Sequence, residues 1–364
     1  MADIDYMKRA LALALRARGE TSPNPLVGAV IVKGSKIIAE GWHKRCGADH
    51  AEIVALKKSG SRARGAKLYV TLEPCSHFGR TPPCLDKILE SGIREVIVGM
   101  KDPNPLNNGR SIRRLKQAGI ITKVGILEEE LSMMNEAFIK YMRTGLPFVT
   151  AKSAQTLDGK IAAANGQSQW ITSPSSRDHA RELRNDFDAI MVGINTVLSD
   201  DPRLNAAKKS KRIKKIIADS TLKIPLNARL FTGTRPEDII VATTTLADKK
   251  KLIELKKKGV NVLVGPAHGN HVHLRWLFKE LGKREITSVL IEGGARVIGR
   301  ALKAGLVDKF LIFIAPKIMG DSAALSSVAG LSISHVNQAV KLRDLTLQPL
   351  NEDLLIEAYV HRDH

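Results

Sequence analysis

The chain has 364 residues, more than a single hydrophobic core usually holds, and a prior of about 150 residues per domain suggests two domains. The net charge is +20, but Lys and Arg are spread along the sequence, which favours a solvated basic surface with some attraction for phosphorylated small molecules over a nucleic-acid-binding surface. Three cysteines exclude a disulfide scaffold, and no secretory signal or apolar run of roughly 18 residues is present, so we expect a soluble cytoplasmic protein.

The first part of the chain predicts an α/β domain. Its strands alternate with helices, which is typical of βαβ units and a largely parallel sheet. One hairpin is expected at Gly34-Ser35, and Gly145 followed by Pro147 marks the expected boundary between domains 1–145 and 146–364. The expected elements are helices over 4–18, beside His50, and over 83–91, 111–117 and 128–142, and strands over 27–32, 36–39, 68–72, 95–98 and 122–126.

The second part predicts another α/β domain. Ser173 as N-cap and Pro174 at the first helical position predict the start of a helix. Residues 290–299 predict a strand, a glycine turn and a helix start, whose backbone amides can cradle phosphates, although glycines in such turns are more often structural. The expected strands are 148–153, 189–193, 215–219, 238–242, 261–264 and 288–292.

The stretch from His50 to Cys84 predicts a catalytic zinc site. His50, Cys75 and Cys84 offer three ligands of the types that zinc prefers, and a catalytic zinc leaves its fourth position to water. Zinc lowers the pKa of that water to about 7. Glu52 can then carry a proton from the water to a leaving amine without binding the metal. Zinc deaminases have a similar pattern, H-x-E with a later P-C-x-x-C, but here eight residues separate Cys75 from Cys84.

Simpler explanations exist for each part of this motif, because H-x-E is common by chance and cysteines are often small buried apolar residues. The surrounding sequence favours zinc, since Pro83 suits the first turn of a helix at Cys84, and a helix N-terminus favours a thiolate. Residues two apart on a helix face different directions, so His50 and Glu52 can share one metal only if it lies off the helix start. A fourth ligand from Cys46 would close the site to water, so we expect Cys46 to be unligated.

Longer motifs occur in both halves of the sequence. Those of the first half are 23–28 (PNPLVG), 50–52 (HAE), 71–77 (TLEPCSH), 79–84 (GRTPPC) and 101–105 (KDPNP). Those of the second half are 157–160 (LDGK), 168–173 (SQWITS), 196–198 (TVL), 200–202 (DDP) and 291–294 (IEGG). With these motifs in order, the chain resembles the bifunctional deaminase/reductase of riboflavin biosynthesis from end to end.

The resemblance implies an α/β protein with a cytidine-deaminase-like zinc domain over 1–145, followed by a dihydrofolate-reductase-like domain over 146–364. It implies two consecutive reactions. The first is hydrolysis of the 2-amino group of 2,5-diamino-6-(5-phosphoribosylamino)pyrimidin-4-one. The second is NADPH-dependent reduction of the ribosyl group to ribityl, which gives 5-amino-6-(5-phosphoribitylamino)uracil.

The resemblance also implies roles for individual residues. The zinc ligands are His50, Cys75 and Cys84, with Glu52 as the catalytic proton carrier. The substrate contacts of the deaminase are Asn24, His77, Arg80, Asp102 and Asn104. The nicotinamide-nucleotide contacts are Ala154, Trp170, Thr196, Asp200, Ser220, Gly294, Ala295, Arg296, Val297, Ile298, Gly299 and Arg300. The substrate contacts of the reductase are Lys152, Ser168, Arg184, Leu204 and Glu292.

The sequence departs from the pattern of the resembled family in three places. Phe78 stands where a second histidine usually follows His77, and residues 106–109 replace a usual valine, alanine and glycine. Ala207 stands where an arginine is expected after Asp201-Pro202, which removes a phosphate ligand from the reductase site. Because cations follow at once, we expect Lys208 to substitute for it.

Two other functions stay open. The zinc motif and the positive charge also fit a nucleic-acid-editing deaminase, although that function explains nothing after Pro147. Alternatively, the second half is a non-catalytic structural module attached to a working deaminase. We expect a phosphorylated pyrimidine as substrate, Zn²⁺ and NADPH as cofactors, no nucleic-acid or membrane partner, and a homo-oligomer.

Overall fold

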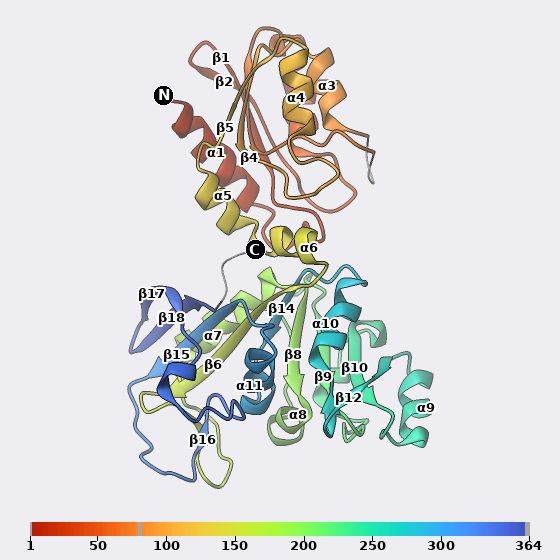
Figure 1. Ribbon diagram of the computed structural model, residues 1–364, viewed down its shortest axis with the longest axis vertical. Coiled ribbons are helices and arrows are strands. Elements are labelled where there is room, and N and C mark those ends of the chain that lie inside the picture. Colours follow the sequence, from red (N-terminus) through yellow and green to blue (C-terminus); the bar gives the residue numbers. More distant parts are fainter. Residues whose placement is uncertain (1, 79–81, 361–364) are drawn as a thin grey trace. The chain divides into compact units, whose positions relative to one another are not determined.

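The computed structural model describes residues 2–78 and 82–360, and the chain divides into two compact units, Met1–Gly145 and Leu146–His364. Each unit contains its own large sheet (Figure 1). Among the described residues, no helix combines the length and the apolar character that crossing a membrane requires.

The first unit is a five-stranded sheet in the order β2-β1-β3-β4-β5. β1 is antiparallel to both β2 and β3, whereas β3, β4 and β5 are parallel, so the expected largely parallel sheet is wrong for this unit. The reason is that a tight turn at Gly34 brings β2 back along β1, and the connection through α2 then carries the chain past β1 to β3, so that β1 runs against both of its neighbours. The elements are α1 (Asp3–Leu15), β1 (Gly28–Lys33), β2 (Lys36–Trp42), α2 (Ala51–Ser59), β3 (Lys67–Leu72), α3 (Cys84–Glu90), β4 (Glu95–Met100), α4 (Arg110–Gln117), β5 (Ile121–Val124), α5 (Glu128–Met134) and α6 (Glu136–Thr144).

Two glycines let helices approach this sheet from opposite faces. A Cβ atom on Gly28 would lie 2.0 Å from the Ala10 carbonyl oxygen of α1, and one on Gly41 would lie 2.2 Å from the Ala51 oxygen of α2. Gly41 pairs with Ala29, whose side chain points away from the Gly28 face, so α1 and α2 pack on different faces. Figure 1 likewise shows α1 and α5 on one side of the sheet and α3 and α4 on the other. The close contact between Gly41 and Ala51 fixes where α2 begins.

The helix expected over 128–142 is two helices, α5 and α6, separated at Asn135. Asn135 is buried, and its side chain accepts a hydrogen bond from Leu26 N (2.8 Å) and donates one to Leu26 O (3.0 Å). These bonds give partners to the backbone N–H and C=O of the loop that leads into β1. They favour a break at Asn135 over a continuous helix. The prediction failed because the partner is 109 residues away in the sequence.

The second unit is a nine-stranded sheet in the order β11-β10-β9-β8-β14-β6-β15-β18-β17. All neighbours from β11 to β15 are parallel, as expected, and the C-terminal strands β18 and β17 add an antiparallel edge that was not predicted. The larger elements are β6 (Phe148–Thr156), α7 (Pro174–Leu183), β8 (Ala189–Gly193), α8 (Ile194–Asp200), β9 (Lys214–Ala218), β10 (Ile239–Thr244), α9 (Lys249–Lys257), β11 (Asn261–Gly265), α10 (Leu274–Gly282), β14 (Ser288–Ile291), α11 (Ala295–Lys303), β15 (Lys309–Ala315), β17 (Arg343–Leu350) and β18 (Asp353–Tyr359). Short strands β7 (Lys160–Ala162) with β16 (Leu325–Ser326), and β12 (Ala267–His268) with β13 (His271–Val272), form two further small sheets.

Alternate residues of the central strand β8 face two separate cores. Met191 packs in a cluster with Phe278 of α10 and residues of α11, while Val192 packs in another with residues of α8 and Leu255 of α9. Helices therefore cover both faces of the sheet, as in other α/β folds with parallel strands. The carboxyl ends of β8, β14 and β6 lie along one edge, which is where ligands bind in such sheets.

Candidate active sites

The zinc-ligand candidates of the first unit come together from three separate elements. His50 is the N-cap of α2, Cys75 follows β3, and Cys84 is the first residue of α3. His50 Nδ1 lies 3.0 Å from Cys84 Sγ and 3.5 Å from Cys75 Sγ, and all three ligand atoms lie within 4.8 Å of one another. Among the described residues this is the one such group of His, Cys, Asp and Glu side chains, and it does not include Cys46.

One imidazole and two thiols in this arrangement fit a zinc ion with three protein ligands and one open position. The backbone N–H of Cys84 donates to Cys75 Sγ (3.2 Å), and the Cys84 thiol also interacts with Cys75. The hydrogen bond from the Cys84 side chain is the main cause that lowers the pKa of the Cys75 thiol. A lower pKa favours the thiolate, which is the form that binds a metal.

Glu52 lies in the first turn of α2, immediately beyond the ligand group. Its side chain is buried, and burial raises its pKa to about 7. A carboxyl group that titrates near neutral pH can both accept and return a proton, as a proton carrier must. His50 is the N-cap of α2 and Glu52 lies in its first turn, so the two residues stand at the start of the helix, where a shared metal was expected.

Asn24 is joined to a histidine that the sequence motifs did not single out. The Asn24 amide donates to His43 Nε2 (3.1 Å), which leaves Nδ1–H of His43 to donate to the Asp49 carbonyl (3.2 Å). The buried His43 ring stands edge-on to the His50 ring, with 5.3 Å between centroids. His43 is therefore part of this site, and its sequence signal was weak because it belongs to none of the motifs.

A second loop, over 102–107, supports the site. Asp102 is buried, and burial raises its pKa to about 6. The side chain of Asn107, which is fully buried, accepts from Ser76 N (2.9 Å) and Ser76 Oγ (2.6 Å) and donates to Asp102 Oδ2 (3.1 Å). Asn104 N donates to Asp102 Oδ1 (2.9 Å). Asn107 lies in the segment that departs from the resembled pattern, and here it ties the loop after Cys75 to the Asp102 loop.

Glu73 is a further residue that sequence reasoning missed. Its buried carboxylate accepts from Gly109 N (2.9 Å), Asp102 N (3.2 Å) and Ser111 Oγ (2.8 Å). It thereby anchors the start of α4 beside the Asp102 loop. Of the other predicted contacts, Arg80 lies outside the described residues, and the neighbouring Phe78 is 78% exposed.

In the second unit, three of the predicted substrate contacts form one charged cluster. Glu292 follows β14, and its carboxylate pairs with Arg184 through Nε–Oε1 (2.7 Å) and Nη2–Oε2 (2.8 Å). Lys152 of neighbouring β6 interacts electrostatically with both residues. Burial lowers the pKa of Lys152, and Arg184 lowers it further, whereas Glu292 opposes both effects.

Several predicted nucleotide contacts gather at the carboxyl edge of the same sheet. The Thr196 side chain in α8 lies against the Gly293-Gly294 turn, where a Cβ atom on Gly294 would be 3.4 Å from Thr196 Oγ1. Ser168 Oγ donates to Asp200 Oδ1 (3.3 Å). Ser220 Oγ accepts from Val272 N (3.1 Å), and the Arg300 guanidinium donates to the carbonyl of the same Val272.

Trp170 is 63% exposed and held at the surface by two cations. The Arg177 guanidinium lies over its ring, 4.3 Å from the centroid, and Lys317 Nζ donates to its carbonyl (3.0 Å). Ala154 lies on β6, two residues after Lys152, and Ala295 and Arg296 open α11. With its ring exposed at the surface, Trp170 does not belong to the hydrophobic core.

Four other predicted contacts point into the protein. Leu204 is buried in the apolar cluster behind the sheet, with a positive φ of 56°, and Val297 and Ile298 are buried on α11. Gly299 packs against backbone, since a Cβ atom there would lie 1.9 Å from the Ala329 oxygen. These four residues shape the site through their backbone or their packing.

Comparisons with known proteins agree with both units. Residues 1–100 match the cytidine and deoxycytidylate deaminase zinc-binding region, and residues 147–356 match the RibD C-terminal domain. The riboflavin biosynthesis protein RibD of Aquifex aeolicus is 44% identical over 356 residues, which cover 97% of each chain. The protein of the same name from Escherichia coli is 42% identical, over 91% of this chain and 92% of that one.

Solved structures give the same result. Acinetobacter baumannii RibD superposes with a TM-score of 0.88 at 35% identity, covering 98% of each chain. A Thermotoga maritima structure described as a diaminohydroxyphosphoribosylaminopyrimidine deaminase/5-amino-6-(5-phosphoribosylamino)uracil reductase superposes with a TM-score of 0.85 at 36% identity, also over 98% of each chain. The expected succession of a cytidine-deaminase-like and a reductase-like fold is confirmed. With this identity over nearly its whole length, the chain belongs to the RibD family of riboflavin biosynthesis proteins.

Proposed function

We propose that the first unit hydrolyses the 2-amino group of 2,5-diamino-6-(5-phosphoribosylamino)pyrimidin-4-one. We propose further that the second unit reduces the ribosyl group of the product to ribityl with NADPH. The observation that carries the proposal is the group of His50, Cys75 and Cys84 beside the buried carboxyl of Glu52, within a chain that matches RibD proteins over both halves.

In the first reaction, His50, Cys75 and Cys84 would hold zinc, which would supply a water of lowered pKa. Glu52 takes a proton from the attacking water and delivers it to the departing amine, so that ammonia leaves and a carbonyl replaces the amino group. Asn24, His77 and Asp102 are the contacts proposed for the pyrimidine. His43 keeps Asn24 in place through its hydrogen bond.

In the second reaction, bound NADPH would supply the hydride for the sugar carbon, and the part of the protein is to orient the two molecules. The residues present fit a dinucleotide, because the Gly293-Gly294 turn opens α11 and leaves first-turn backbone amides for phosphate oxygens. Thr196 and Asp200 lie in α8, which follows β8, and Ser220 follows the neighbouring parallel strand β9. Lys152, Arg184 and Glu292 form the charged wall proposed for the substrate.

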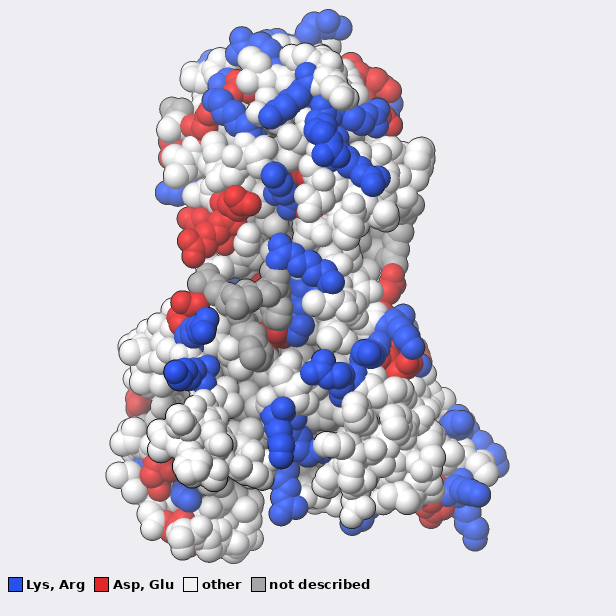
Figure 2. Space-filling view, in the orientation of Figure 1, with Lys and Arg blue, Asp and Glu red and all other residues white. Residues whose placement is uncertain are grey.

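The match over both halves favours this function over the two alternatives. An editing deaminase leaves the second unit without a purpose, and on the visible face of the second unit the Lys and Arg side chains form separate groups (Figure 2). A non-catalytic second unit leaves the charged cluster at Glu292 without a purpose. A cytoplasmic location and a homo-oligomer remain part of the proposal.

The decisive experiment supplies the diaminopyrimidine substrate and NADPH to the purified zinc-loaded protein. Mass spectrometry of the pyrimidine and the absorbance of NADPH follow the two steps separately. Ammonia release without NADPH, followed by NADPH oxidation when it is added, supports the proposal. Deamination without any NADPH oxidation would reduce the second unit to a structural module, and deamination of an RNA or DNA base instead would favour the editing function.

A further inference from the structure

A hollow of about 320 Å³ opens beside the deaminase site, and among the described residues His77 is the one predicted contact that lines it. On one side it is bounded by Ser76 and His77, which directly follow the zinc-ligand candidate Cys75. On the other side it is bounded by α4. The remaining lining residues are Leu106, Arg110, Arg113, Arg114 and Gln117.

The α4 side of the hollow is strongly cationic. Arg110, Arg114 and Gln117 are four and three residues apart, so they share one face of the helix, and Arg113 is three residues from Arg110. Arg114 has a long contact with Asp86 (3.4 Å), but within the described part of the chain the Arg110 and Arg113 guanidinium groups have no carboxylate partner. Like charges at this spacing repel one another, which raises the free energy of the hollow when it is empty. An anion bound between the arginines offsets this repulsion.

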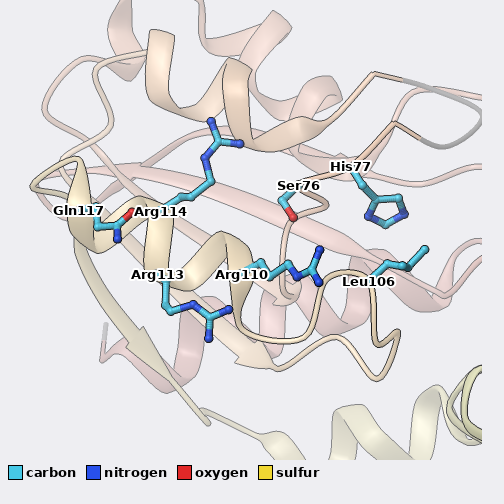
Figure 3. A pocket seen from close by; sticks show the side chains of 7 residues that line it. All are labelled: Ser76, His77, Leu106, Arg110, Arg113, Arg114 and Gln117. Carbon is cyan, nitrogen blue, oxygen red and sulfur yellow. The ribbon is translucent and has the colours of Figure 1, made fainter.

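The guanidinium of Arg110 is the one best placed for such an anion. Figure 3 shows it extending from the first turn of α4 toward the side of the hollow formed by Ser76, His77 and Leu106, whereas Arg114 extends in another direction. Arginine presents several N–H groups in a planar fork and binds phosphate through two parallel hydrogen bonds. Arg110 therefore offers a phosphate a directed contact, and Arg113 and Arg114 add positive potential.

His77, on the other wall of the hollow, has a ring atom that no described residue contacts through a hydrogen bond. This atom, Nδ1, is buried, which makes the missing hydrogen bond costly. Hydrogen bonds hold the walls around it in place, since Ser76 N donates to Asn107, and Gly109 N at the start of α4 donates to Glu73.

We propose that this hollow is the phosphate subsite of the deaminase domain, in which Arg110 binds the 5-phosphate of the pyrimidine substrate. The inference rests on the proposed deaminase function and adds to it the group that selects phosphorylated substrates. The pyrimidine lies at the ligand group beyond Cys75, the ribosyl linker passes His77, and the phosphate reaches the α4 arginines.

The test compares the phosphorylated substrate with its dephosphorylated analogue in the deamination reaction of the full, zinc-loaded chain. For the unmodified protein we expect the Michaelis constant of the phosphorylated substrate to be lower by roughly tenfold or more, the range of a charged hydrogen bond. Arg110→Met should abolish that difference by raising the Michaelis constant of the phosphorylated substrate toward that of the dephosphorylated analogue. The pair Arg113→Met and Arg114→Met should reduce it less and make it less sensitive to salt.

Lys116→Met is the matched control, because Lys116 is an exposed cation of α4 that does not line the hollow. This variant should behave like the unmodified protein. Zinc content and reduction of the supplied intermediate show that each variant is folded. Equal weakening of both substrates by Arg110→Met, or no preference for phosphate in the unmodified protein, would overturn the subsite.

Competition distinguishes a substrate phosphate from a free anion. Ribose 5-phosphate should inhibit deamination in the unmodified protein and lose that effect in Arg110→Met. If inorganic phosphate binds as tightly as ribose 5-phosphate and neither slows deamination, the hollow is a free-anion site and the proposal is wrong. If the protein deaminates neither pyrimidine, the proposed function fails first, and calorimetric titration of ribose 5-phosphate into Arg110→Met and unmodified protein still decides whether Arg110 binds a sugar phosphate.

Discussion

Arg184 and Glu292 form a doubly hydrogen-bonded ion pair, with contacts of 2.7 and 2.8 Å, although 108 residues separate them in the sequence. The remaining arm of Arg184 donates through Nη1 to the Asn205 carbonyl (2.8 Å). The guanidinium is thus largely occupied by protein groups, and its charge is balanced by Glu292. Any phosphate bound in the reductase site needs a further cation.

Replacing Glu292 should damage the reductase selectively. Glu292→Gln keeps the shape but leaves Arg184 and Lys152 as neighbouring uncompensated cations, and breaking a buried ion pair costs about 3 to 5 kcal/mol. Denaturant unfolding should show lower stability of the second unit, and NADPH oxidation should fall, while deamination stays. Asp178→Asn removes an exposed pair with Arg181 and should change stability by less than about 1 kcal/mol. A Glu292→Gln variant as stable as Asp178→Asn would contradict the role assigned to the cluster.

Introducing at position 207 the arginine expected from the family pattern should strengthen substrate binding in the reductase. Ala207 is exposed, and Arg212, the arginine that follows it, is held by Asp238 through two hydrogen bonds (3.0 and 2.9 Å). Because a charged hydrogen bond contributes about 1.5 to 3 kcal/mol, Ala207→Arg should lower the reductase Michaelis constant by roughly one to two powers of ten. Lys208→Ala should raise it, since Lys208 is the cation expected to substitute. If neither variant changes the reductase Michaelis constant in steady-state kinetics, residue 207 has no part in substrate binding.

The pH dependence of stability should reveal the buried lysine of β9. Lys215 Nζ donates to Arg203 O (2.6 Å), Asn205 Oδ1 (2.8 Å) and Thr234 Oγ1 (2.6 Å). Burial lowers its pKa to about 8 from the ordinary value of 10.5.

Between these values the unfolded chain binds more protons than the folded chain, so Lys215 makes the free energy of unfolding rise with pH from about 8 to about 10.5. Urea unfolding of the unmodified protein and of Lys215→Met should therefore diverge across this window, with the rise missing in the variant. Lys209→Met, which removes an exposed lysine, should follow the unmodified protein. Parallel curves for all three proteins would show that Lys215 titrates as if it were in water.

Metal analysis should find about one zinc per chain, because three ligands gather at a single place among the described residues. Cys75→Ala should lose most of the metal and the deaminase activity, whereas Cys46→Ala should keep both. Removing the metal with a chelator should stop deamination and leave reduction of the supplied intermediate unchanged. Full zinc in Cys75→Ala would mean that another side chain binds the metal.

The sequence singled out the candidate zinc ligands and the candidate proton carrier, which lie in short motifs. His50, Glu52, Cys75 and Cys84 could be identified because zinc chemistry restricts the ligand types, and the structure brings the three ligand candidates within 4.8 Å of one another. The parallel sheet of the second unit also followed from local patterns, since alternating strands and helices leave few other arrangements.

What the sequence did not predict depends on partners that are distant in the chain. Asn135 ends a helix because it bonds to Leu26, and His43 joins the zinc site because it bonds to Asn24. Asn107 looked like a departure from a pattern, yet it is buried between two loops of the site. No periodicity or spacing encodes such contacts, which arise only when the sheet is assembled.

The most direct measurement is a two-step assay of Glu52→Gln. The glutamine preserves the shape of the side chain but cannot carry a proton, so the variant should keep about one zinc and lose deamination by about 10² to 10⁴. When the deaminated intermediate is supplied, the same variant should oxidise NADPH at the rate of the unmodified protein. Near-normal deamination would show that another group moves the proton, and loss of NADPH oxidation would contradict two independent catalytic sites in one chain.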